Sequence, residues 1–120
     1  MNQSFRVRCH LNSEDSGLLD DILESARLAL SYVDGITDDQ FDSDQLRQDA
    51  VAYRIGIIGE ATRSLSVAAK DAIGLDWTAM MGMRNRLFHG YRDTNLLTLW
   101  KTVKIDLPEV VSLIEPFLQR

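Results

Sequence analysis

The sequence predicts an all-α protein, an antiparallel bundle of four to five helices, and three observations support this fold class. Apolar residues recur at three- and four-residue steps along nearly all of the 120 residues. Glycine, proline and helix-capping residues divide these runs into lengths that are typical of helices. Only residues 5–11 alternate apolar and polar side chains, so any strand is confined to this stretch, which could equally be a tail.

The length is that of one domain, because a chain of this size has room for a single core. We expect residues 1–14 to form an N-terminal arm or leader and residues 15–120 to form the helical domain. No apolar run reaches the roughly 20 residues of a membrane helix, and residues 1–10 lack the apolar core of a signal peptide. We therefore expect a cytoplasmic protein, in which the single cysteine, Cys9, forms no internal disulfide.

The first predicted helix carries one buried stripe and ends before Gly35, a residue suited to the position just past a helix. A connector from Ile36 to Asp42 follows, in which Thr37 and Gln40 have the spacing of a capping box for a short turn. The residues of the predicted stripe are Leu18, Leu19, Ile22, Leu23, Ala26, Ala29, Leu30 and Val33.

The second predicted helix is the longest and runs from about Ser43 to Lys70. It contains Gly56 and Gly59, each of which costs about 1 kcal/mol relative to alanine inside a helix. We expect another helix to approach closely over this glycine face, because such packing would offset the cost. The predicted buried stripe consists of Leu46, Ala50, Tyr53, Ile57, Ala61, Leu65 and Ala68.

Three further helices are predicted in the second half of the chain. The third starts at an Asp76 cap, runs through Trp77 to about His89 and is ended by Gly90. A fourth runs from about Asn95 to Leu107, with Leu96, Trp100 and Val103 on its apolar face. Asp106, Pro108 and Glu109 predict the cap and first turn of a fifth helix. Its predicted stripe is Val111, Ile114, Phe117 and Leu118.

The charge is distributed unevenly along the chain. Although the net charge is −5, residues 77–105 hold five basic residues against one acid, a local charge of +4, and the remainder carries −9. Such asymmetry is typical of an anion site on an acidic body, and equally of a run of solvated charges. The basic residues are Arg84, Arg86, Arg92, Lys101 and Lys104.

Arg84 interrupts the apolar stripe of the third predicted helix. An unpaired buried charge costs several kcal/mol, so this guanidinium needs a carboxylate partner, a route to water, or an anion supplied by a ligand. All three solutions are compatible with the pattern. The remaining members of the stripe are Trp77, Met80, Met81, Leu87 and Phe88.

Gly82, Asn85 and His89 share one face of the same helix. A small residue on a polar face predicts close approach of another helix, which could belong to a second copy of the chain. A metal site is not expected, because His10 and His89 are the only histidines and no ligand motif surrounds them. By itself, a histidine at a helix end is more often a cap than a catalyst.

Arginine, asparagine and histidine together suit metal-independent cleavage of RNA. The 2′-hydroxyl is then the nucleophile, an imidazole moves the proton, and a guanidinium binds the charge that grows on the phosphate. In-line cleavage needs both a base and an acid, and one histidine per site supplies only one of them. A two-fold homodimer that pairs the third helices would supply the second.

The segment from Arg84 to Tyr91 resembles the signature of the HepT-like toxins, which belong to the HEPN superfamily of helical ribonucleases. The signature is an arginine, four residues, a histidine, any residue and a tyrosine, here Arg84, His89 and Tyr91. The resemblance extends over most of the chain in separate blocks that keep their order. These are Leu18–Glu24, Gln48–Val51, Ile57–Ala61, Trp77, Gly82–Asn85 and Asp106–Pro108.

The resemblance implies a HEPN-like dimeric bundle that cleaves RNA without metal or other cofactor. It assigns Arg84, Asn85 and His89 as the catalytic residues. It assigns Tyr91 as the tyrosine to which a minimal nucleotidyltransferase antitoxin of the MntA type transfers AMP, which silences the toxin. Seen without the resemblance, Tyr91 would be a packing aromatic. Unlike many relatives, the chain has Arg92 and Asp93 after this tyrosine.

We therefore expect an endoribonuclease toxin of a toxin–antitoxin pair, with RNA substrate contacts from Arg86, Arg92, Lys101 and Lys104. Two alternatives stay open. One is a non-catalytic nucleotide- or substrate-binding subunit that partners a nucleotidyltransferase, and the other is a purely structural dimer. Phe88 and Trp100 could stack on RNA bases, although their helical spacing favours the core.

Overall fold

The computed structural model describes residues 11–89 and 95–118, without the side chains of Met83 and of residues 86–89. All regular structure in these residues is helical. Residues 5–10, most of the alternating stretch, lie outside this description. The elements in chain order are α2 (Ser13–Tyr32), α3 (Asp38–Asp42), α4 (Gln45–Ser64), α5 (Val67–Ile73), α6 (Trp77–His89), α7 (Leu96–Lys101), the π-helical η2 (Thr102–Asp106) and α8 (Leu107–Leu118).

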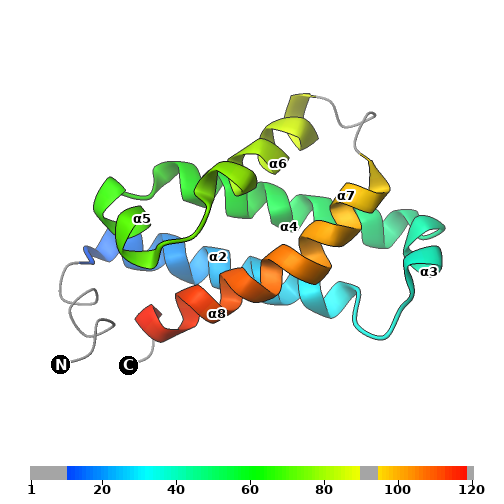
Figure 1. Ribbon diagram of the computed structural model, residues 1–120, viewed down its shortest axis with the longest axis horizontal. Coiled ribbons are helices and arrows are strands. Elements are labelled where there is room, and N and C mark those ends of the chain that lie inside the picture. The colour runs from blue at the N-terminus through cyan, green and yellow to red at the C-terminus, as the bar shows by residue number, and fades with distance from the viewer. Residues whose placement is uncertain (1–10, 90–94, 119–120) are drawn as a thin grey trace.

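The long helices run alternately in opposite directions (Figure 1). α2 and α4 lie side by side and antiparallel, α6 packs along α4, and α8 returns along α2. The short helices α3 and α5 lie at opposite ends of the α2–α4 pair. The prediction of an all-α bundle is therefore confirmed for the described residues, none of which forms a strand.

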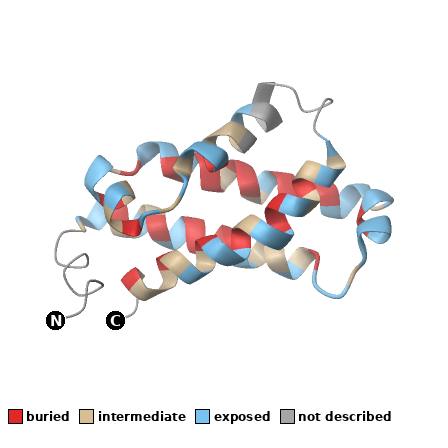
Figure 2. Cartoon of the chain, in the orientation of Figure 1, coloured by how far each residue is buried: buried red, intermediate tan, exposed pale blue. Residues whose placement is uncertain are grey.

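The core lies between α2, α4 and the segment from α7 to α8, where red residues face one another in Figure 2. The predicted stripe of the first helix is confirmed, because its members from Leu19 to Val33 are buried or packed against the core. Residues with at most 1% of their surface exposed include Leu19, Ile22, Ile55, Ile58, Val103, Leu107, Val110 and Ile114.

The turn between α2 and α4 follows the sequence prediction. Gly35 has φ +76°, a left-handed conformation that glycine adopts without the cost of a side chain. The Thr37 hydroxyl accepts the Gln40 N–H at 3.1 Å, and the Gln40 side chain accepts the Thr37 N–H at 2.9 Å. This reciprocal pair is the predicted capping box, and it starts α3 so that Phe41 enters the core fully buried.

The prediction of one continuous helix from Ser43 to Lys70 is wrong, because the helix breaks at Leu65 and Ser66. Ser66 caps α5: its hydroxyl accepts the Ala69 N–H at 3.1 Å. The buried carboxylate of Asp15 on α2 accepts both the Ser66 N–H at 3.0 Å and its hydroxyl at 2.6 Å. The Ser66 N–H therefore bonds to a residue distant in sequence instead of continuing the helix.

The predicted stripe of the second helix is also wrong for most of its members. Leu46 and Tyr53 are 79% and 64% exposed, and only Ala61 and Leu65 of that stripe are buried. The buried face includes two polar residues that hydrogen-bond locally: Gln48 donates to the Phe41 and Asp42 carbonyls, and Thr62 donates to the Ile58 carbonyl. The buried residues of α4 are Gln48, Val51, Ala52, Ile55, Gly56, Ile58, Gly59, Ala61 and Thr62.

The expected break between the fourth and fifth helices at Asp106 does not occur. The chain stays helical from Leu96 to Leu118, with the π-helical turn η2 in between. The Leu107 N–H bonds five residues back, to the Thr102 carbonyl. Because Pro108 has no N–H and its ring crowds the preceding turn, a locally widened turn lets the helix pass the proline without ending.

None of the helices in the described ranges is both long and apolar enough to cross a membrane.

Candidate functional site

α6 contains the candidate site residues Arg84, Asn85 and His89, and it starts as predicted. The Asp76 carboxylate accepts the Thr78 N–H at 3.1 Å, which caps the helix. Trp77 donates its indole N–H to the Lys70 carbonyl at 3.1 Å, and Met80 is buried. These contacts fix the first turns of α6 against α5 and the core. α6 is described as far as His89, and Gly90, the predicted end of the helix, lies outside the described residues.

Arg84 lies in the middle of α6, and its side chain is 16% exposed. Its Nη2 forms an ion pair with Oε1 of Glu60 on α4. Its Nη1 donates to Oδ1 of Asn85 at 3.0 Å. Of the three solutions that the sequence left open for this arginine, the structure contains the carboxylate partner.

Gly59 makes this contact possible. A Cβ placed on Gly59 would lie 2.3 Å from Cβ and 2.4 Å from Cγ of Arg84, far inside van der Waals distance. The stem of Arg84 therefore lies directly over the Gly59 backbone. The expected close approach of another helix over the glycine face is confirmed at Gly59, and the side chain that approaches is the candidate catalytic arginine.

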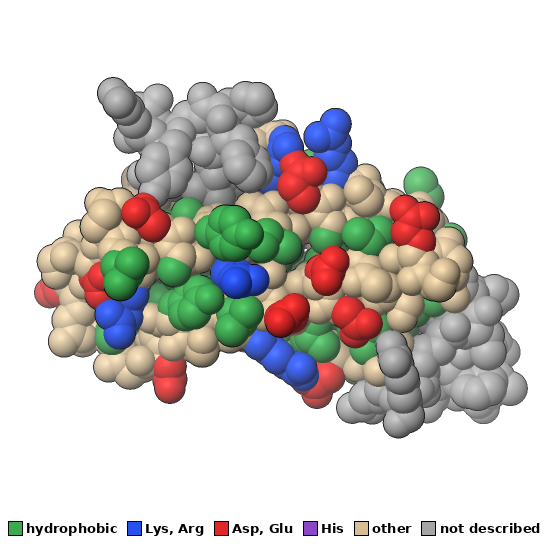
Figure 3. All heavy atoms as spheres, turned by 180° about the vertical axis from the view of Figure 1, so that it is seen from behind, with side chains coloured by type: hydrophobic (Ala, Val, Ile, Leu, Met, Phe, Trp, Pro, Cys, Tyr) green, Lys and Arg blue, Asp and Glu red, His purple; other side chains and the backbone are tan. Residues whose placement is uncertain are grey.

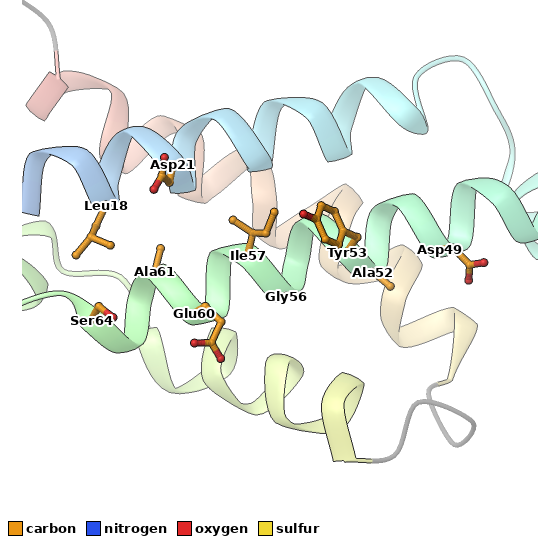
Figure 4. A pocket seen from close by; sticks show the side chains of 10 residues that line it. All are labelled: Leu18, Asp21, Asp49, Ala52, Tyr53, Gly56, Ile57, Glu60, Ala61 and Ser64. Carbon is orange, nitrogen blue, oxygen red and sulfur yellow. The ribbon is translucent and has the colours of Figure 1, made fainter.

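A groove of about 610 Å³ follows the outer face of α4 and is bounded on one side by Leu18 and Asp21 of α2 (Figure 4). Glu60 lies at its edge and points towards α6, whereas Ile57 and Ala61 point towards α2. Asp21 and Asp49 add two more carboxylates. The apolar lining residues are Leu18, Ala52, Tyr53, Ile57 and Ala61. The space-filling view from behind shows apolar side chains gathered over the middle of the molecule (Figure 3).

The other predicted site residues are described only in part. α6 contains both Arg84 and His89, but the side chains of His89 and Arg86 are not described. Tyr91 and Arg92 lie outside the described residues. Asn85 is exposed and Gly82 is half-buried, one helical turn apart on α6.

The two predicted RNA-contacting lysines lie beyond the gap in the description. Lys101 is exposed at the end of α7, and Lys104 holds its ammonium 5.0 Å from the centre of the Trp100 ring. Trp100 packs on Phe41 with ring centres 5.2 Å apart. This places Trp100 against the core, as its helical spacing favours, and leaves Lys104 exposed above it.

Sequence reasoning missed Glu60. A carboxylate partner was one of three solutions that the sequence left open for Arg84, and a close helix approach was expected over Gly59. The sequence did not connect the two expectations, because Glu60 and Arg84 are 24 residues apart in the chain. The position of Glu60 directly after the glycine was the available signal. The ion pair also changes the electrostatics of the site. The negative charge of Glu60 offsets the positive charge of Arg84, so the local positive charge is smaller than the count along the sequence indicates.

The chain is similar in sequence to a known protein family and to several of its members. Residues 22–117 match the family described as "Ribonuclease HepT-like". A protein of Methanocaldococcus jannaschii named "Putative RNase MJ1380" is 34% identical over 96 residues, which cover 79% of this chain and 88% of the relative. A protein of Thermococcus cleftensis named "Probable ribonuclease HepT" is 34% identical over 93 residues, which cover 77% of this chain and 84% of the relative.

No solved structure matches the chain significantly. The family match nevertheless covers most of the helical bundle, from α2 to α8, and includes the helix with Arg84, Asn85 and His89. This chain therefore belongs to the HepT-like ribonuclease family.

Proposed function

We propose that the protein is a metal-independent endoribonuclease and the toxin of a toxin–antitoxin pair. One observation carries the proposal: in a chain of this ribonuclease family, the Arg84 guanidinium is held by Asn85 on the helix that also contains His89. A guanidinium fixed by its neighbours costs little reorganisation when charge develops on a bound phosphate.

In the proposed reaction the 2′-hydroxyl of RNA attacks the adjacent phosphorus, and the bond to the 5′-oxygen of the next nucleotide breaks. One His89 imidazole takes the proton from the 2′-hydroxyl, and a second returns a proton to the leaving oxygen. Arg84 stabilises the extra negative charge on the phosphate oxygens, and Asn85 orients the phosphate or the imidazole. The products are a 2′,3′-cyclic phosphate and a free 5′-hydroxyl.

The reaction needs two imidazoles, so we place the site between two copies of the chain related by a two-fold axis. The groove on α4 supports this arrangement, because Tyr53 and Ile57 leave apolar surface exposed on the helix against which α6 packs. Burying this surface against a second copy would stabilise the dimer through the hydrophobic effect.

RNA would reach the site along the basic residues Arg86, Arg92, Lys101 and Lys104, through contacts with its phosphates. The antitoxin would be a minimal nucleotidyltransferase of the MntA type that transfers AMP to Tyr91. Tyr91 is two residues from His89 in the chain. An adenylate phosphate there would bring a fixed negative charge to the place where RNA binds its own phosphate.

The test is His89→Ala, because this change removes the proposed acid and base. The variant should stay folded and dimeric but lose RNA cleavage and growth inhibition, measured with a labelled single-stranded RNA and by expression in cells. The control is Lys70→Ala, which replaces a half-buried lysine of α5. Unchanged cleavage by His89→Ala would refute the catalytic role. Binding of RNA without cleavage by the wild-type protein would favour the non-catalytic subunit instead.

The antitoxin part is tested by co-expression with a nucleotidyltransferase of this type. The Tyr91 peptide should gain the mass of one adenylate, seen by mass spectrometry, and cleavage should fall. A Tyr91→Phe protein that is still silenced by modification at another residue would refute this assignment.

A further inference from the structure

Glu60 is a charged residue in contact with Arg84, and its exposure to solvent differs from that of the arginine. The Glu60 side chain is 49% exposed, whereas that of Arg84 is 16% exposed. A guanidinium that is mostly removed from water is costly unless it is paired and hydrogen-bonded. Glu60 therefore stabilises Arg84 in this place, and a half-exposed carboxylate can do so at a smaller desolvation cost of its own.

Two bonds fix the direction of the guanidinium as well as its charge. Glu60 on α4 holds Nη2, and Asn85 on α6 holds Nη1 at 3.0 Å. Because the guanidinium is planar, contacts at both terminal nitrogens from two helices restrain its rotation. Its five N–H groups lie in one plane, so the direction in which Glu60 and Asn85 hold the guanidinium also sets the direction of its other N–H groups.

Gly59, the residue before Glu60, determines how closely Arg84 approaches α4. Gly59 lets the stem of Arg84 lie on the α4 backbone, where any side chain would collide with it. Glu60 then follows one position further along the helix, with its carboxylate pointing towards α6 (Figure 4). Gly59 and Glu60 together form the contact surface for Arg84: glycine leaves room for the arginine stem because it has no side chain, and the Glu60 carboxylate binds the guanidinium.

We propose that Glu60 is a positioning residue, which orients Arg84 for the phosphate of the RNA; this rests on the ribonuclease function proposed above. Glu60 does not transfer a proton in this proposal and does not contact the reacting atoms. Its effect passes through the guanidinium, so that removing it misplaces a group whose geometry decides the rate.

The experiment compares Glu60→Ala and Glu60→Gln with the wild type on the same labelled RNA. Loss of the carboxylate should lower kcat by about tenfold to a hundredfold, because misplacement of a catalytic group acts mainly on the transition state, while KM changes by less than about threefold. Glu60→Gln keeps an acceptor oxygen of similar shape and should recover most of kcat. Glu24→Ala, which removes an exposed glutamate of α2, is the control.

Two results in this assay would overturn the proposal. A wild-type kcat for folded Glu60→Ala protein would reduce the ion pair to a structural contact. An increase in cleavage or in RNA affinity for both variants would mean that Glu60 competes with the phosphate for Arg84. In either case the wild-type protein still cleaves RNA, so the ribonuclease function would stand while the role of Glu60 would fall.

A second measurement tests the positioning without any cleavage. In protein labelled with ¹⁵N-arginine, restrained rotation of the Arg84 guanidinium should give separate NMR signals for its two terminal nitrogens. These signals should merge in Glu60→Ala and stay separate in Glu60→Gln. Averaged signals in the wild type would overturn the positioning role of Glu60, whether or not the protein cleaves RNA. Absence of RNA cleavage by the wild type would instead refute the proposed ribonuclease function.

Discussion

The two faces of α4 have similar apolar content but different environments. One face is sealed against the core and includes Ile55 and Ile58, each 1% exposed. The other lines the groove with Tyr53 and Ile57 and meets α6 at Gly59 and Glu60. The comparison shows that the same helix supplies the core with its closed face and the candidate site with its open face.

The largest expected effect distinguishes these faces through two neighbouring isoleucines. Ile58→Ala should lower the free energy of unfolding by about 2–5 kcal/mol, because it leaves a cavity in a closed core. Ile57→Ala removes the same atoms from the half-buried groove side, so the folded monomer should lose much less. Urea unfolding of both variants measures the difference.

Equal losses for both isoleucines would contradict the division into a closed and an open face. The proposed dimer gives the pair a second use. Ile57→Ala should weaken association, measured by analytical ultracentrifugation over a range of protein concentrations. Unchanged association would remove the groove from the dimer contact.

The division of α4 into these faces explains where the sequence was informative. Hydrophobic periodicity predicted correctly the burial of the apolar stripe from Leu19 in α2 to Val33 at its C-cap, because Ser25 is the only buried polar residue in this range. In α4 both faces are apolar, and the buried face includes Gln48 and Thr62, whose polar groups are satisfied by nearby carbonyls. Hydrophobic periodicity does not register such local bonds, so it selected the open face.

The candidate site was predictable in part for a similar reason. The local signals for Arg84 and Asn85 lie within one helical turn, and the Gly59 approach follows from helix propensity. The Glu60 partner and the Asp15–Ser66 bonds depend on where helices distant in sequence meet. The break between α4 and α5 at Ser66, where Asp15 binds, has no neighbouring glycine or proline from which it could be predicted.

The next largest effect concerns the contact of the open face with α6. Gly59→Ala should destabilise the fold by about 1–3 kcal/mol, because the new methyl group overlaps the Arg84 stem and pushes α6 away from α4. Helix propensity alone predicts the opposite sign, a gain of about 1 kcal/mol. Thermal unfolding measures the change.

Gly17→Ala provides the matched control for this substitution. Gly17 lies in α2, and nothing lies within 4 Å of the position of its Cβ. This variant should therefore be more stable than the wild type by about 0.5–1 kcal/mol. If Gly59→Ala were stabilised to the same extent, the stem of Arg84 on α6 would not pack against Gly59 in solution.

The smallest expected effect lies at the start of α4, away from both faces. Asp44 caps the helix, and the backbone N–H of Arg47, followed by the Arg47 side chain, holds the pKa of the Asp44 carboxyl below its usual value. A lowered pKa in the folded state means that the carboxylate contributes stability above the unfolded-state pKa, about 3.9, and that this stability is lost as the pH falls through the folded-state pKa.

Asp44→Asn keeps an oxygen that can cap the helix but removes the charge. The wild type should therefore exceed this variant slightly in stability near neutral pH and approach it in urea unfolding below about pH 4. A difference that does not change with pH would assign the contribution of Asp44 to cap geometry alone, and the start of α4 would then be independent of its charge.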